Sequence, residues 1–320
     1  MPAIITRGAI SARGFGFGAS AAGGGGGDGT VGIFAIGLAG SLVATRDKYT
    51  YASCTSTACG VGAASAASRN GTAAGNSTRG IFAIGVPISG GASAIRNKYT
   101  YSTCSSTACG VASSTAGSVG GSAAGNSTRG IFALGAATTT RNKYTYACCS
   151  STASGVAVSS ATSCNGAAAG NLTRGIFALG SCTTTRNKYT YACCSSTASG
   201  VASSSATSSA GSAAGNGTRG IFAIGYTGGT VSSIRNKYTY SCCTNTASGV
   251  GAASAASLWG SAAGNSTRGI FALGAVCFCG SSIRNKYTYS SCTSTASGVA
   301  SQSTASYQSS GVSWATCVNS

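Results

Sequence analysis

The chain has 320 residues with a formal net charge of +18, and it contains no histidine and only two acidic residues, Asp28 and Asp47. This composition excludes most enzyme chemistry, because general acid–base catalysis, serine triads and paired-carboxylate hydrolysis depend on His, Asp or Glu. We therefore expect a non-enzymatic protein with no catalytic residue, no cofactor and no resident metal, and a carbohydrate-active enzyme is the weaker alternative.

Residues 1–19 are predicted to form an N-terminal arm that anchors the chain or helps to close a blade. They lack the long apolar core of a secretory signal, and the chain has no run of about 18 apolar residues, so we expect no membrane insertion. Residues 20–300 hold six repeats. Residues 301–320 form a C-terminal tail that can complete a blade by pairing with the arm.

Two constant stretches define the six repeats. The first has the form Gly-Ile-Phe-Ala-Ile-Gly and begins at Gly32, Gly80, Gly130, Gly175, Gly220 and Gly269. The second has the form Arg-Asn-Lys-Tyr-Thr-Tyr and begins at Arg46, Arg96, Arg141, Arg186, Arg235 and Arg284. Repeats of this length are typical of solenoids and propellers, in which each unit packs against its neighbours. We therefore expect one all-β domain despite the length.

Each repeat is predicted to contain four strands, which in the third copy span roughly 121–125, 130–135, 142–149 and 155–161. The turn between the first two holds small polar residues that are typical of hairpins. The second strand is apolar throughout, which indicates burial on both faces. The third alternates basic residues with Asn and Tyr, which predicts one solvated and one packed face. In the first copy we expect the first strand at residues 20–23.

All length variation between the repeats lies in the loop that joins the second and third strands. Successive Ile-Phe pairs are 48, 50, 45, 45 and 49 residues apart, and the loop holds 8, 10, 5, 5 and 9 residues, so the remainder is always 40. In a cyclic array these loops emerge on one face, which is often a binding face. Pro87, Tyr226 and Phe278 are their candidate contact residues. Neutral drift of an exposed loop is the alternative.

The repeat unit resembles the blade of a kelch-type β-propeller, with a hairpin, an apolar strand ending in Gly and a third strand that carries Tyr. The run Gly-Asn-Ser-Thr-Arg-Gly-Ile-Phe-Ala-Leu-Gly is similar to the kelch-like repeats of bacteriophage tail proteins. The resemblance implies a virion-associated propeller of about six four-stranded blades, or seven if the chain ends form a whole blade. Single glycines such as Gly85 replace the kelch Gly doublet. A β-solenoid is the alternative fold, although its coils usually repeat at shorter periods.

The cations recur at fixed places in the repeat and supply the candidate binding residues. The second constant stretch contributes Arg46, Lys48, Arg96, Lys98, Arg141, Lys143, Arg186, Lys188, Arg235, Lys237, Arg284 and Lys286, and the second strand begins with Arg79, Arg129, Arg174, Arg219 and Arg268. We expect two cationic rings at opposite ends of the blades, which would attract anionic polymers. Nucleic acid is disfavoured because the tyrosines alternate toward the packed face. In the alternative, each Arg bonds blade carbonyls and each Lys is solvated at the rim.

Six equivalent cysteines follow the second constant stretch: Cys54, Cys104, Cys149, Cys194, Cys243 and Cys292. We expect them to be small buried core residues rather than metal or redox sites. Local disulfides could join Cys54 to Cys59, Cys104 to Cys109, or Cys277 to Cys279, but spacing does not show whether the sulfurs meet.

These features lead us to expect a phage structural protein on the exterior of the tail or capsid, made in the host cytoplasm. Its variable loops would contact the host surface, with anionic glycans as the ligand. The alternative is a purely architectural decoration or assembly protein that binds other virion proteins. A homo-oligomer fits either role.

Overall fold

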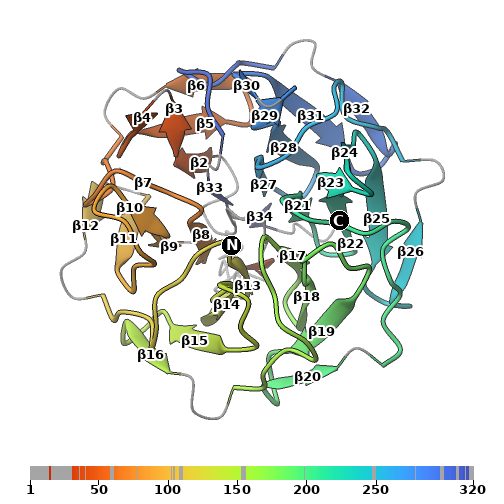
Figure 1. Cartoon of the computed structure of the whole chain (residues 1–320), viewed down its shortest axis with the longest axis horizontal. Helices are drawn as coiled ribbons and strands as arrows, with labels where there is room; N and C mark the ends of the chain where they lie inside the picture. Colours follow the sequence, from red (N-terminus) through yellow and green to blue (C-terminus); the bar gives the residue numbers. More distant parts are fainter. Residues whose placement is uncertain are drawn as a thin grey trace, which may run out of the picture.

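The chain folds as a ring of six antiparallel sheets (Figure 1). The computed structural model describes residues 14–15, 31–35, 37–39, 41–57, 61–76, 78–101, 103, 105–107, 111–152, 156–197, 199–246, 250–277, 279–295, 299–307, 310–313 and 315–316. In this part of the chain there is no helix, and each of the six sheets has four strands. The predicted all-β propeller is therefore confirmed, with six blades rather than seven.

Five blades are each formed by one contiguous segment, whose strands follow one another from the central axis outward. The second blade contains β8 (Thr72–Gly75), β9 (Arg79–Ala83), β11 (Arg96–Thr100) and β12 (Ser105–Thr107), and the third contains β13 (Ser122–Gly125), β14 (Arg129–Ala133), β15 (Arg141–Thr145) and β16 (Ser150–Thr152). The fourth contains β17 (Ala167–Gly170), β18 (Arg174–Ala178), β19 (Arg186–Thr190) and β20 (Ser195–Thr197). The fifth contains β21 (Ser212–Gly215), β22 (Arg219–Ala223), β25 (Arg235–Thr239) and β26 (Thr244–Thr246), and the sixth contains β27 (Ser261–Gly264), β28 (Arg268–Ala272), β31 (Arg284–Thr288) and β32 (Thr293–Thr295).

The first blade combines strands from both ends of the chain. Its order from the axis is β33 (Ser310–Ser313), β2 (Val31–Ala35), β5 (Arg46–Thr50) and β6 (Thr55–Thr57). Strand β33 pairs antiparallel with β2, with Phe34 opposite Gly311. The ring is thus closed within a sheet. Strand β33 takes the innermost position that we expected residues 20–23 to fill, and those residues lie outside the described part of the chain.

The outermost strand of each blade was predicted in the wrong place. In the third blade it is β16, three polar residues that follow the turn 146–149 directly and pair with β15. The predicted segment 155–161 instead belongs to the connection to the next blade; its described residues form no strand. The prediction followed apolar residues such as Val156, whereas an outer strand packs on few neighbours and needs no apolar pattern.

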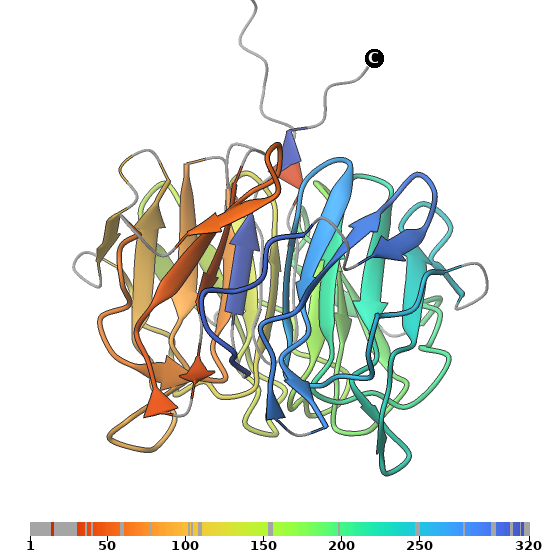
Figure 2. The same ribbon diagram turned by 90° about the horizontal axis from the view of Figure 1, so that it is seen from above.

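The blades define two faces of the disc. The hairpin face carries the turns between first and second strands and those between third and fourth strands, such as residues 126–128 and 146–149. The loop face carries the variable loops between second and third strands: residues 38–45, 86–95, 136–140, 181–185, 226–234 and 275–283. The short strands β1 (Gly14–Phe15) and β34 (Ala315–Thr316) pair above the hairpin face, near the axis (Figure 2).

The loops on the loop face differ in backbone form. The longer ones contain short antiparallel pairs: β3 (Leu38–Ala39) with β4 (Ser41–Leu42), β23 (Tyr226–Thr227) with β24 (Thr230–Val231), β29 (Ala275–Val276) with β30 (Cys279–Gly280), and β10 (Val86–Pro87) with β7 (Ser68–Arg69) of the preceding connection. The five-residue loops turn through two residues with positive φ, such as Ala136 at 52° and Ala137 at 55°. The variation in length is therefore accommodated without disturbing the blades.

The core consists of the interfaces between neighbouring blades. One cluster joins Ile131 of the third blade to Phe177 and Tyr189 of the fourth, and all three side chains are fully buried. The third strand is packed on both faces, because Asn142 and Tyr144 face the preceding blade while Arg141 faces the following one. The predicted packed face is confirmed, whereas the face predicted to be solvated is half-buried at Lys143 and Thr145 and fully buried at Arg141. Each blade is sandwiched between two others, which leaves no free sheet face.

Candidate functional site

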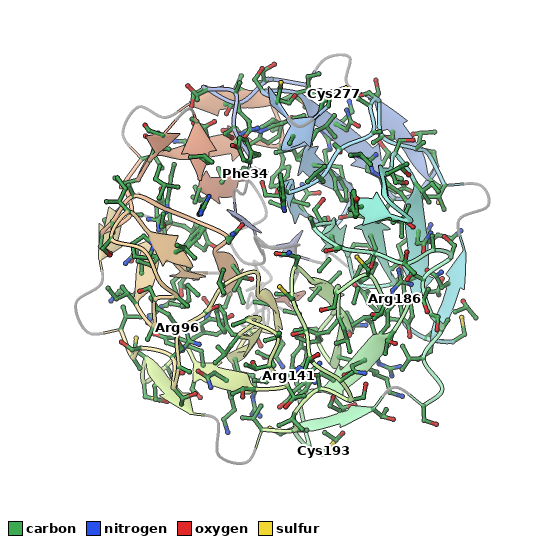
Figure 3. All side chains as sticks on the ribbon, in the orientation of Figure 1. Phe34, Arg96, Arg141, Arg186, Cys193 and Cys277 are labelled. Atoms are coloured by element: carbon green, nitrogen blue, oxygen red, sulfur yellow. The ribbon has the colours of Figure 1, made fainter. Side chains whose placement is uncertain are left out.

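The arginines that open the second constant stretch lie inside the propeller, between adjacent blades. Arg96 is only 1% exposed, and its guanidinium carbon lies 4.6 Å from the ring centroid of Phe132 in the next blade. Its Nη2 donates to Asn142 Oδ1 at 3.4 Å, and its Nη1 donates to the hydroxyl of Ser151. Arg46, Arg141, Arg186, Arg235 and Arg284 lie in the same way over Phe82, Phe177, Phe222, Phe271 and Phe34, at 4.4–4.7 Å. Figure 3 shows Arg96, Arg141 and Arg186 at successive positions around the ring.

This placement corrects the predicted cationic ring on the loop face. The six arginines are buried because each guanidinium stacks on an aromatic ring and meets hydrogen-bond acceptors in the next blade, which offsets part of the cost of desolvation. Burial lowers the pKa of five of them to about 10 and that of Arg186 to about 9. They join blades together and are not available to a ligand on the surface.

The six lysines of the same strands are half-buried: Lys48, Lys98, Lys143, Lys188, Lys237 and Lys286. Each is paired in register with the buried Ile of the second strand, as Lys143 is with Ile131. Within the described residues no hydrogen bond or ion pair joins an ammonium group of these lysines to the protein. Their charges are therefore not neutralised by a protein group in that part of the chain.

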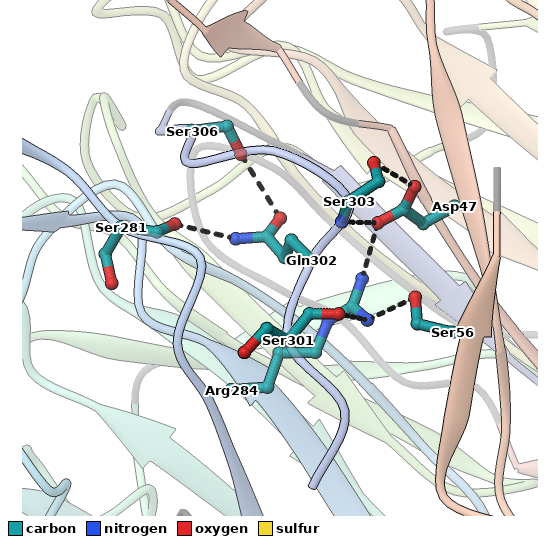
Figure 4. A network of polar contacts seen from close by, with 8 residues as sticks. All are labelled: Asp47, Ser56, Ser281, Arg284, Ser301, Gln302, Ser303 and Ser306. Atoms are coloured by element: carbon teal, nitrogen blue, oxygen red, sulfur yellow. Dashed lines mark hydrogen bonds and ion pairs between the residues drawn. The ribbon is translucent and has the colours of Figure 1, made fainter.

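One interface, between the sixth and first blades, has a carboxylate in place of the amide. Asp47 stands where the other blades carry Asn, and its Oδ2 lies 3.1 Å from Arg284 Nη2 with both side chains fully buried. The same carboxylate accepts hydrogen bonds from the backbone N–H of Ser303 at 2.9 Å and from its hydroxyl at 2.6 Å (Figure 4). Arg284 Nη1 donates to Ser56 and to the carbonyl of Ser301. This network ties the C-terminal connection to the first blade.

The second set of arginines lies at the opposite end of the blades, as the antiparallel register predicts. Arg79 is paired with Thr100, whereas Arg96 is paired with Ala83. Arg79 is half-buried, and its Nη1 donates to the carbonyl of Tyr146 in the next blade at 3.0 Å. Arg129, Arg174, Arg219 and Arg268 make the same bond to Tyr191, Tyr240, Tyr289 and Tyr51.

Each of these arginines follows an Asn-containing turn that also reaches the next blade. Asn126 Oδ1 accepts hydrogen bonds from the backbone N–H of Thr128 and of Arg129, and its Nδ2 donates to the carbonyl of Leu172 in the adjacent hairpin at 3.2 Å. The sequence indicated the turn but not this contact between blades. The recurrence of Asn and Arg three residues apart was the available signal.

Val31 replaces the arginine at the interface between the first and second blades. The tyrosine on the other side, Tyr101, is 9% exposed, against 1–2% for its five equivalents. Substituting Val31→Arg is expected to add a hydrogen bond to the carbonyl of Tyr101 and to raise the free energy of unfolding by about 1 kcal/mol. Urea denaturation checks this, with Val31→Lys as a control that adds charge without the guanidinium fork. An equal or larger gain for lysine would show that hydrogen-bond geometry is not the cause.

The loop residues chosen from the sequence do not form one cluster. Pro87 lies in β10 and Tyr226 in β23, both half-buried, and Phe278 lies outside the described residues. Four isoleucines of the variable loops are exposed, Ile88, Ile95, Ile234 and Ile283, with Ile88 73% exposed; Val158 in the connection after the third blade is also exposed. Three of the isoleucines directly precede a buried arginine, a position held by Thr45, Thr140 and Thr185 in the other blades.

The repeated cysteines that the structure describes pack against the edge of the core, but they are half-buried rather than fully buried as predicted. Cys149 is half-buried in a turn with φ of 53°, and its sulfur accepts a hydrogen bond from Arg79 Nη1 of the preceding blade at 3.4 Å. Cys54, Cys194, Cys243 and Cys292 are placed in the same way, and Cys104 lies outside the described residues. Of the possible disulfide partners, Cys54, Cys277 and Cys279 are free thiols, and Cys59 and Cys109 are not described.

Three consecutive blades carry an additional, exposed cysteine in the same turn, of which Cys193 is shown near the outer edge of the ring (Figure 3). A hydrogen bond with the hydroxyl two residues later lowers the pKa of Cys148, Cys193 and Cys242. The three thiols occupy separate blades, and no group of three or more His, Cys, Asp or Glu side chains that could hold a metal occurs among the described residues.

In the part of the chain that the structure describes, no helix is long and apolar enough to span a membrane. No family model matches the chain, and a search of curated proteins found no match. The arrangement of blades, interfaces and faces is therefore the basis for a functional proposal.

Proposed function

We propose that this chain is a non-enzymatic structural protein that docks onto a protein partner through its loop face. The observation that carries the proposal is the chemistry of this face: four isoleucines are exposed on it, while the arginines nearest to it are buried. The isoleucines lie in the loops of the second, fifth and sixth blades, so a partner would contact them at separate points around the face rather than in one apolar patch. The near absence of acids and the lack of histidine support a role without catalysis.

The resemblance to phage tail repeats suggests which partner this is. A propeller on the exterior of a tail or capsid would use the loop face to bind another virion protein, which corresponds to the architectural role. Contact of the same loops with anionic host-surface glycans was the first expectation; the arginines that were expected to attract such a ligand to this face are buried between the blades. The variable loop lengths fit a partner that differs around the ring, since each loop offers its own contact.

The test uses residues that the chain already carries at equivalent positions. Ile95→Thr, Ile234→Thr and Ile283→Thr copy Thr45, Thr140 and Thr185, so the triple variant should fold normally. Purified wild type and variant are incubated with phage particles that lack this chain and, separately, with bacterial cells, and association is measured by cosedimentation. We expect wild type to join the particles and the variant to lose most of this association.

Each alternative has its own outcome. Equal association of the variant with particles would exclude the loop face as the contact surface. Association of wild type with cells, lost in the variant, would favour host attachment through the loops. Sedimentation velocity of the free protein detects self-association, which would identify the partner as a second copy if the threonine variant abolished it.

A further inference from the structure

Three equivalent pockets open on the hairpin face, each between two neighbouring blades. The pocket between the fifth and sixth blades has a volume of about 280 Å³, that between the second and third about 200 Å³, and that between the fourth and fifth about 150 Å³. The largest is lined by Asn216, Arg219, Ser266, Thr267, Thr288 and Tyr289. Arg79 and Arg174 occupy the place of Arg219 in the other two. The repeat therefore builds the same concave site several times around the ring.

Each pocket presents a fixed and unneutralised guanidinium. Arg219 Nη1 is held by the carbonyl of Tyr289 at 2.8 Å and by Cys292 Sγ at 3.5 Å, which orients the planar group. Within the described residues Nε and Nη2 of Arg219 make no hydrogen bond, and the same holds for Arg79 and Arg174. The one acidic residue described, Asp47, is paired with Arg284 in another place. The Nε and Nη2 groups of each of these three guanidiniums can therefore donate hydrogen bonds to an oxyanion.

The remaining walls favour a sugar over a nucleic acid base. Hydroxyl groups line each pocket, as those of Ser266, Thr267 and Thr288 do in the largest, and such groups hydrogen-bond to sugar hydroxyls. Recognition of single-stranded nucleic acid relies on exposed aromatic rings for base stacking. The tyrosines that border the pockets, Tyr146, Tyr240 and Tyr289, are at most 2% exposed and offer the pocket little of their rings.

From this geometry we infer that the pockets on the hairpin face bind the acidic groups of an anionic polysaccharide, one group at each arginine. The three sites share one rigid ring, so a polymer that reaches several of them gains avidity over a single weak contact. This site lies on the face opposite to the proposed protein-docking surface and does not depend on it. A propeller bound through its loop face would keep these pockets exposed.

Two triple variants remove the site in different ways, and the chain supplies a precedent for each. Arg79→Val, Arg174→Val and Arg219→Val copy Val31 and remove the guanidinium groups. Ser127→Leu, Gly217→Leu and Ser266→Leu copy Leu172 of the fourth blade and fill the pockets while every charge is kept. As a control, the triple variant Lys143→Gln, Lys188→Gln and Lys237→Gln also removes three positive charges, but from the third strands rather than from the pockets.

Binding is measured by surface plasmon resonance on immobilised heparin, polygalacturonate and polyphosphate, with neutral dextran as a blank. We expect wild type to bind at least one of the anionic polymers, and both pocket variants to bind it about tenfold or more weakly than the lysine control. The polymer that binds distinguishes sulfate, carboxylate and phosphate as the recognised group. Higher salt should weaken binding, because half-exposed charges are screened.

Three results would overturn the inference. Wild-type affinity in the leucine variant would mean that the pockets are not occupied, and an equal loss in the lysine control would reduce the binding to net charge alone. Stronger binding to single-stranded DNA than to any of the polysaccharides, with the same loss in the pocket variants, would reassign the sites to nucleic acid. The cosedimentation experiment with phage particles tests the loop face alone, so the proposed docking and the pocket inference can fail independently of each other.

Discussion

Above about pH 10 the propeller is expected to lose stability steeply and to unfold in one transition between about pH 11 and pH 13. The cause is a set of buried tyrosines whose pKa burial raises above the ordinary value of 10: Tyr49, Tyr144, Tyr146, Tyr189, Tyr191, Tyr238, Tyr240, Tyr287 and Tyr289. In the unfolded chain these phenols ionise near pH 10, whereas in the propeller they stay protonated. The unfolded state then binds fewer protons, so the free energy of unfolding falls as pH rises.

The buried arginines contribute with the opposite sign. Their pKa is lowered to about 10, or to about 9 for Arg186, so the unfolded state holds these protons more tightly and stability rises with pH in the same range. Nine tyrosines outnumber six arginines. The net effect is a loss of about 4 kcal/mol per pH unit, and this exceeds the 5–15 kcal/mol of a typical domain within a few units.

Absorbance at 295 nm and far-UV circular dichroism, recorded on the same alkaline titration, test this expectation. Tyrosinate formation and loss of β-structure should coincide in one step. Tyr191→Phe removes one ionising group and should shift the midpoint to higher pH. Tyrosinate that forms gradually near pH 10 while the dichroism stays unchanged would show that the phenols are accessible in the folded ring.

Replacing Asp47 by alanine is expected to lower the free energy of unfolding by about 3–5 kcal/mol, because it leaves Arg284 charged, buried and without its partner. It also removes the acceptor of two hydrogen bonds from Ser303. Urea denaturation followed by tryptophan fluorescence measures the change.

Asp47→Asn is the matched control, because the chain already uses asparagine at this place in the other blades. Asn97 Oδ1 accepts from Arg46 and from the backbone N–H of Ser65, and its Nδ2 donates to the Ser65 hydroxyl. We expect this variant to lose less than about 1 kcal/mol. A loss as large as that of alanine would mean that the charge itself, rather than the hydrogen-bond pattern, stabilises this interface.

The architecture could be predicted because the spacing of the repeats sets the number of blades and each apolar run marks a buried strand. A constant 40 residues outside one loop fixes six equivalent units, and Ile131 to Leu134 reads as a buried strand in any copy. The outer strand could not be located in this way. Residues 150–152 are polar and form an edge, so their pairing with β15 follows from the turn at 146–149 rather than from hydrophobicity.

Whether each arginine is buried or exposed depends on contacts between neighbouring blades. These contacts cannot be seen within a single repeat. Arg96 looks like a rim residue in its own strand, and only the ring of Phe132, about 36 positions along the chain and in the next blade, buries it. Arg79 could be assigned to the opposite end from strand direction alone. Its role in lining a pocket needed the neighbouring hairpin, because that wall comes from Ser127 and Thr128 of the following repeat.

The closing strand has a consequence for how the molecule is made. On its inner edge, strand β2 (residues 31–35) pairs with β33 (residues 310–313), which lies about 280 positions later in the sequence. Five blades can form from local segments during synthesis, but the first blade keeps an open inner edge until residues 310–313 have been made. Contacts so distant in sequence are slow to form. An unpaired strand edge is also a site at which two growing chains can pair by mistake. The slowest and most error-prone step of folding is therefore expected to be the pairing of β33 with β2, rather than the formation of any of the other five blades.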